Sequence, residues 1–146
     1  MIAPPPAASA DPASPGEIPA PHGSLGRGSR LQYKRDFDRV FQRGRRAHGH
    51  HIHLIASPPR EQDAPPRLGL AVAKGVGHAP ARARLRRLTR EAFRVLRPAL
   101  RRPVDLVVSA RLPWPNAQLV DVLEEMMLLG KKLRLIDSGL TAESLS

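Results

Sequence analysis

Apolar residues within 81–97 recur at spacings of three and four, a pattern that predicts an α-helix. One face of this helix carries Leu85, Leu88, Ala92 and Leu96. Arginines recur at the same spacing on another face, namely Arg82, Arg86, Arg90, Arg94 and Arg97. We therefore expect an amphipathic helix that packs on its apolar side and presents a cationic side to solvent.

Patterns before and after this helix predict further elements. A first helix is expected at residues 34–42, where Phe37, Val40 and Phe41 share a face and Gly44 marks the end. Strand-like segments are expected at 51–56, 67–73 and 104–110, with a loop at 58–66. The chain is therefore expected to have strands both before and after the cationic helix in the sequence.

A last helix is expected from about Asn116, carrying Leu119, Leu123, Met126 and Leu133. No internal repeat is visible. The order helix, strands, helix, strand, helix predicts an α+β fold, a small sandwich built on a single sheet.

We expect this domain to span residues 30–136 and to be followed by a short tail at 137–146. Residues 1–29 hold seven of the 16 prolines of the chain, and Ala, Ser and Gly fill most of the remainder. Such a segment has too little apolar area to offset the entropy lost on ordering. Residues 1–29 are therefore predicted to be a disordered tail.

Positive charge is concentrated in one window of the chain. Residues 67–102 hold eleven Lys and Arg residues against one acid, Glu91, and so carry ten of the eleven net positive charges. Ordinary solvated faces mix both signs, whereas stacked arginines repel one another until an anion binds them. With a sequence pI of about 11.5, this patch predicts a partner that is a nucleic acid or an anionic membrane surface.

The sequence disfavours a membrane-spanning protein and a secreted protein. No apolar run approaches the roughly 18 residues of a membrane-spanning helix, and the N-terminus lacks the pattern of a signal peptide. We therefore expect a cytoplasmic protein without membrane contact. The chain has no cysteine, which excludes disulfides, thiolate metal sites and cysteine nucleophiles.

Five blocks of sequence, in order over roughly residues 30–135, resemble the protein subunit of bacterial ribonuclease P. They are residues 37–41 (FDRVF) with Gly44 three residues on, 67–74 (RLGLAVAK), 76–77 (VG), 82–93 (RARLRRLTREAF) and 105–111 (DLVVSAR). The resemblance implies a fold with an unusual left-handed strand-helix-strand crossover. It also implies that a catalytic RNA with its Mg²⁺ ions removes the 5′ leader of precursor tRNA, so that the protein supplies no catalytic residue and no metal site.

The resemblance implies two RNA-binding surfaces. The catalytic RNA is expected to contact Lys74, Arg82, Arg84, Arg86, Arg87 and Arg90. The single-stranded leader is expected in a groove between the first helix and the sheet, at Phe37, Phe41 and Ile55. The two phenylalanines are equally open to the interpretation that they form the core side of that helix. No obligate protein partner is expected.

The chain departs from the family pattern at several positions within these surfaces. Ala83 replaces an asparagine between two arginines, Gly75 stands where a second lysine usually follows Lys74, and His78 stands where asparagine is common. Ile55 occupies a position that is often aromatic, so base stacking there would be replaced by apolar contact. These differences affect the strength and detail of RNA contacts more than the predicted function.

Four histidines, at positions 48, 50, 51 and 53, raise the possibility of a metal site. On a strand His51 and His53 would point one way and His50 the other, and no carboxylate is near them in the sequence, so we expect polar strand positions, some near RNA. Protonation below a pKa of about 6.5 would give them positive charge. Trp114, between two prolines, is expected to be a packing anchor at the exit of the strand, with an RNA contact as the alternative.

No protein-only nuclease can be assembled from the acids, which are scattered over an early helix, a strand and the last helix. The alternative function is that of a structural RNA-binding protein, such as a ribosomal component. A DNA-compacting protein is disfavoured by the compact core that the apolar pattern predicts.

Overall fold

The computed structural model describes residues 30–31, 33–61 and 64–145, and the predicted tail at 1–29 lies outside them. The helices are α2 (Lys34–Arg43), α3 (Ala79–Leu96), α4 (Leu119–Lys132) and the short α5 (Ala142–Leu145), with 3-10 turns η3 (Lys74–Val76) and η4 (Arg97–Ala99). The strands are β1 (Arg45–His48), β2 (Ile52–Ser57), β3 (Arg67–Val72) and β4 (Asp105–Ala110). This is the α+β fold on a single sheet that the pattern predicts.

The four strands form one sheet in the order β1-β2-β4-β3. β1 pairs with β2 and β2 with β4 in antiparallel fashion, whereas β3 and β4 are parallel. Helix α3 connects the two parallel strands, so the expected strand-helix-strand crossover is present. Its left hand stays a prediction from the resemblance.

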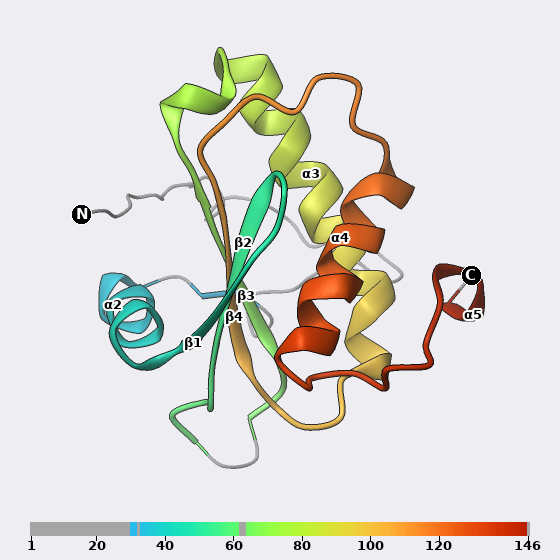
Figure 1. Ribbon diagram of the computed structural model, residues 1–146. Coiled ribbons are helices and arrows are strands. Elements are labelled where there is room, and N and C mark those ends of the chain that lie inside the picture. The colour runs from blue at the N-terminus through green and yellow to red at the C-terminus, as the bar shows by residue number, and fades with distance from the viewer. Residues whose placement is uncertain (1–29, 32, 62–63, 146) are drawn as a thin grey trace, which may run out of the picture.

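Helices cover both faces of the sheet, as Figure 1 shows with the sheet seen nearly edge-on. Helix α2 lies on one face, over a small core of Leu31, Phe37, Val40, Ile55 and Val107. Helices α3 and α4 lie side by side on the other face, where the main core is centred on Leu54, Leu106, Phe93 and Met126. Two separate apolar layers therefore hold the sheet.

A network of charges ties α2 to the sheet beside its small core. Asp105, at the start of β4, is fully buried and accepts hydrogen bonds from Arg39 of α2 and from Arg67 of β3. Asp36 of α2 lies 3.7 Å from the same Arg67 guanidinium. The hydrogen bonds that Arg67 donates to Asp105 outweigh the cost of burial and raise the pKa of Arg67. α2 is thus fixed over the end of the sheet where β3 and β4 begin.

The predicted bounds of the elements hold within one to three residues, with two additions. The first helix ends before Gly44 as predicted, and α3 begins at Ala79 with Pro80 in its first turn. Strand β1 was not predicted, and neither was α5, which lies in the segment expected to be a tail.

The last helix begins later than predicted. α4 starts at Leu119, not near Asn116, because Asn116 has a φ of 63° and Gln118 caps the helix together with Asp121. Leu133, which the pattern placed on this helix, is buried just after its end.

Candidate RNA interface

The cationic face predicted for the long helix lies on α3. Its opposite side is buried at Leu85, Leu88, Ala92 and Leu96, as predicted. On the basic side Arg84 and Arg87 are exposed, whereas Arg82, Arg86 and Arg90 are half-buried. Guanidinium groups held in a row on a rigid helix are suited to contact successive phosphates of an RNA backbone.

The arginines of α3 are not equivalent. Arg84 donates a hydrogen bond of 2.6 Å to the carbonyl oxygen of Ala117, which ties α3 to the loop before α4. Arg94 pairs with Glu91 at 2.9 Å, so the acid within the basic window is neutralised on its own helix. Arg84 therefore has a structural contact in addition to its predicted contact with RNA.

The segment leading into α3 is shaped by a close backbone approach. A Cβ atom on Gly75 would lie 2.4 Å from the carbonyl oxygen of Arg111, the residue after β4. A larger residue would require the backbone to shift, so this chain has no room for the second lysine that the family pattern suggests at this position. Lys74 is exposed at the start of this turn and Ala83 is exposed on α3.

The predicted leader residues lie where α2 packs on the sheet, with Phe37 and Phe41 on α2 and Ile55 on β2. Phe37 is 7% exposed and packs against Gly69, where an added Cβ would lie 2.8 Å from its ring. Ile55 has no exposed surface. Phe41 is only partly buried, and the Arg46 guanidinium lies 5.7 Å from the centroid of its ring. Among the three, Phe41 offers an accessible ring, while Phe37 and Ile55 pack beneath it as core residues.

The acids are less scattered than the sequence indicated. Asp36 and Asp105, 69 positions apart in the chain, meet beside Arg39 and Arg67. Both carboxylates are buried and face guanidinium groups, so this pair is a structural ion network between α2 and the sheet. It does not have the open carboxylates that a nuclease uses to hold metal ions.

The histidines are arranged differently from the prediction. His51 lies in the turn before β2 and His53 lies on β2, so they do not share a strand face. The Nδ1 atoms of His48 and His53 are in contact across the β1–β2 pair. His51 instead lies next to Glu125 of α4, with Nδ1 and Oε1 3.0 Å apart, so a carboxylate is close to the histidines after all.

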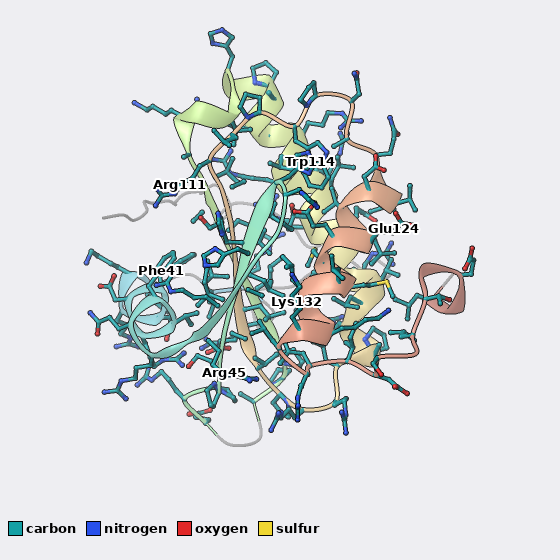
Figure 2. The ribbon with its side chains drawn as sticks, in the orientation of Figure 1. Phe41, Arg45, Arg111, Trp114, Glu124 and Lys132 are labelled. Carbon is teal, nitrogen blue, oxygen red and sulfur yellow. The ribbon has the colours of Figure 1, made fainter. Side chains whose placement is uncertain are left out.

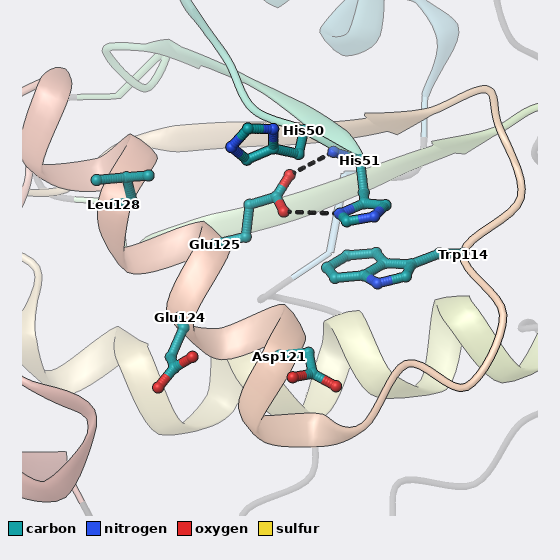
Figure 3. A pocket seen from close by; sticks show the side chains of 7 residues that line it. All are labelled: His50, His51, Trp114, Asp121, Glu124, Glu125 and Leu128. Atoms are coloured by element: carbon teal, nitrogen blue, oxygen red, sulfur yellow. Dashed lines mark hydrogen bonds and ion pairs between the residues drawn. The ribbon is translucent and has the colours of Figure 1, made fainter.

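Glu125 anchors the β1–β2 turn to α4 (Figure 3). Its Oε2 accepts hydrogen bonds from the backbone N–H groups of His51 and Ile52, at 2.7 and 2.9 Å. Burial opposes ionisation, but these bonds from His51 and Ile52 outweigh it and lower the pKa of Glu125. Trp114 stacks on the His51 ring with centroids 4.0 Å apart, which confirms its predicted role as a packing anchor.

These side chains line an open pocket of about 300 Å³. Its wall consists of His50, His51, Trp114, Asp121, Glu124, Glu125 and Leu128. Figure 2 shows Trp114 and Glu124 on the side of the sheet that faces α4, and Phe41 and Arg111 on the side of α2. The pocket and the predicted leader groove are therefore on opposite faces.

Within the described ranges no group of three or more His, Asp or Glu side chains is arranged to hold a metal ion. In the same part of the chain, no helix is both long enough and apolar enough to cross a membrane.

Two cations near the predicted leader groove were not singled out from the sequence. Arg46 on β1 donates a 2.6 Å hydrogen bond to the carbonyl oxygen of Phe41, and Arg111 is exposed after β4. Both are close enough to His53 to lower its pKa, after burial and His48. Recognition of β1 as a strand would have placed Arg46 and His48 on one face, since strand residues two apart point the same way.

Comparison with known proteins identifies the family. The model of the family described as Ribonuclease P matches residues 25–134. The "Ribonuclease P protein component" of Shouchella clausii is 36% identical over 107 residues, and that of Syntrophus aciditrophicus is 31% identical over the same length. Each alignment covers 73% of this chain and 87% of the relative.

A solved structure supports the fold. The RNase P protein of Staphylococcus aureus superposes with a TM-score of 0.66 at 24% identity, covering 75% of this chain and 98% of that one. The family model matches most of the domain, the alignments cover most of each relative, and the fold is shared with a solved structure. The chain therefore belongs to the ribonuclease P protein family.

Proposed function

We propose that this chain is the protein subunit of a ribonuclease P ribonucleoprotein that removes the 5′ leader from precursor tRNA in the cytoplasm. The RNA subunit with its Mg²⁺ ions carries out the hydrolysis. The protein binds that RNA through the basic side of α3 and through Lys74. It binds the leader in the groove beside α2, so both RNAs are held on one small scaffold.

The observation that carries this proposal is the cationic side of α3, in a chain that belongs to this family. Double-stranded RNA hides its base edges in a deep groove, so proteins recognise it through phosphates and shape. An arginine row on a helix suits that kind of recognition.

The leader has a different chemistry. Its unpaired bases can stack on an accessible aromatic ring, a contact worth about 1–3 kcal/mol per base. Phe41 offers such a ring, and the Arg46 guanidinium beside it supplies positive charge for the leader backbone.

The direct test is reconstitution. Purified protein is mixed with its candidate catalytic RNA and a precursor tRNA at a low Mg²⁺ concentration at which the RNA alone is nearly inactive. We expect 5′ cleavage that neither component achieves alone. RNA binding without any stimulation of cleavage would contradict the proposal and would favour a structural RNA-binding protein, such as a ribosomal component.

A further inference from the structure

Four titratable or cationic side chains gather on the α2 face of the sheet, beyond the end of α2. Arg46 and His48 come from β1, His53 from β2 and Arg111 from the end of β4. The strand register places His48 directly opposite His53, and Arg46 opposite Ile55. This group borders Phe41, since Arg46 lies over the Phe41 ring.

The two imidazoles form a pair that can hold one shared proton. Their Nδ1 atoms are in contact and the rings stand at 82° to each other. With both rings neutral, one Nδ1 carries hydrogen and the other accepts it, so one Nε2 is a donor and the other an acceptor. Added protonation makes both Nε2 atoms donors, and two N–H donors with a positive charge suit a phosphate oxygen.

We propose that His48 and His53, between Arg46 and Arg111, bind a backbone phosphate of single-stranded RNA and take up one proton when that RNA binds. The inference rests on the proposed function, because the site lies next to Phe41 in the groove assigned to the leader. It adds a phosphate contact and a pH dependence to that groove.

The electrostatics of the free protein support this coupling. Burial, then His48, Arg111 and Arg46, lower the pKa of His53, and Glu125 of α4 acts weakly in the opposite direction. Ser109, which pairs with His53 in the sheet, and Phe41, which lies beside Arg46, are uncharged near neutral pH. A phosphate placed among these cations would oppose their effect on the pKa of His53. Binding and protonation then favour each other, as linkage requires.

The first test compares two RNAs on the reconstituted holoenzyme, from pH 8 to pH 6. The measured quantity is the Kd for mature tRNA divided by the Kd for precursor tRNA, which isolates the leader from general phosphate binding. We expect this ratio to increase by about threefold to tenfold as the pH falls, for uptake of up to one proton.

Variants locate the effect. His48→Gln with His53→Gln keeps neutral hydrogen-bonding groups but cannot take up a proton, so the ratio should become nearly independent of pH. His50→Gln is the matched control, because His50 lies in the turn and borders the pocket near α4. It should behave like the unchanged protein. His48→Gln alone serves if the double variant is unstable, since His48 is exposed.

A second measurement needs no variant. The ring signals of His48 and His53 are titrated by NMR in the full-length protein, with and without a short single-stranded RNA oligonucleotide. Both titrations should move to higher pH when the oligonucleotide is present. Unmoved titrations would overturn the inference.

The outcomes separate the two proposals. A preference for precursor tRNA that does not change with pH, or that keeps its pH dependence in the double variant, overturns the role of the histidines and leaves the leader groove intact. Equal binding of both tRNAs at every pH overturns the leader groove and this inference with it.

Discussion

At the scale of single residues, the absence of a side chain at Gly69 determines where Phe37 can lie. The Phe37 ring occupies the space next to β3 that a Cβ on Gly69 would enter, at 2.8 Å from two ring atoms. The ring is thereby placed in the small core under α2, with Val40 and Ile55. Phe41, one helical turn later, lies at the edge of this small core and stays partly accessible to solvent.

Gly69→Ala should therefore lower the free energy of unfolding by about 1–3 kcal/mol, the usual cost of an overpacked core. Urea unfolding measures it. Gly139→Ala is the matched control, since the nearest atom to its added Cβ is 4.0 Å away, and it should change stability little. If the cost comes from the ring, it should be smaller in a Phe37→Leu background. An equal cost there would rule out this contact as the cause.

Phe41→Ala should weaken the binding of precursor tRNA to the holoenzyme by about fivefold to 100-fold, the loss of one stacked base. Mature tRNA, which lacks the leader, should bind almost as before. Phe37→Ala provides the contrast, since this residue is buried. It should lower stability and affect both RNAs alike. If Phe41→Ala weakened the binding of precursor tRNA and of mature tRNA equally, Phe41 would not be a leader-binding residue.

At the scale of elements, the sequence predicted those with a clear period and missed those without one. The apolar residues of α3 identify its buried side, and the apolar run in 104–110 identifies β4. Strand β1 is four residues long and buries only Ala47, so it has no alternation to detect. It exists because its backbone pairs with β2.

The position of His51 shows the second limit of prediction from the pattern. Its contact with Glu125 joins residues 74 positions apart and depends on how α4 packs against the hairpin. Local spacing contains no information about that packing. The meeting of Asp36 and Asp105 was missed for the same reason, whereas the α3 arginines share one helix and could be grouped from the sequence.

Glu125→Gln should destabilise the protein by about 1–3 kcal/mol at pH 7, because it weakens the bonds that hold the β1–β2 turn to α4. Folding lowers the pKa of Glu125. The ionised carboxylate therefore contributes to the free energy of unfolding above its ordinary pKa of about 4.5, and this contribution is lost as the pH falls through the lowered pKa. The difference between the two proteins in urea unfolding should therefore shrink below that pH. Exposed Glu124→Gln is the control, and a pH-independent difference would contradict the assignment.

The combined change Arg82→Ala and Arg86→Ala should weaken binding of the catalytic RNA and flatten its salt dependence. Each phosphate contact adds about one unit to the magnitude of the slope of the logarithm of the RNA-binding constant against the logarithm of the salt concentration. Loss of the two arginines should therefore reduce this magnitude by about 1–2. Lys131→Ala with Lys132→Ala removes the same charge from the end of α4. An unchanged slope in the arginine variant, or an equal change in the lysine variant, would exclude α3 as the interface.

At the scale of the whole molecule, the sheet separates two surfaces with different chemistry. The α2 face carries Phe41 and Arg111 (Figure 2), and the strand register adds the His48–His53 pair, while α3 and α4 cover the other face (Figure 1). The buried ion network at Asp105 and the two apolar layers fix these surfaces relative to each other. A rigid scaffold of this kind can hold a folded RNA and a single strand at a constant distance.

The charge that would bind RNA belongs to the folded domain and not to the N-terminal segment. Residues 1–29 contain one arginine, Arg27, against two acids, Asp11 and Glu17, so they add no net positive charge from side chains. Since phosphate binding depends on the number of cations in contact, deletion of these residues should leave the salt slope of RNA binding unchanged. Stimulation of 5′ cleavage at low Mg²⁺ should also be nearly retained. A large loss of cleavage with an unchanged slope would show that the segment contacts RNA through groups other than its charges.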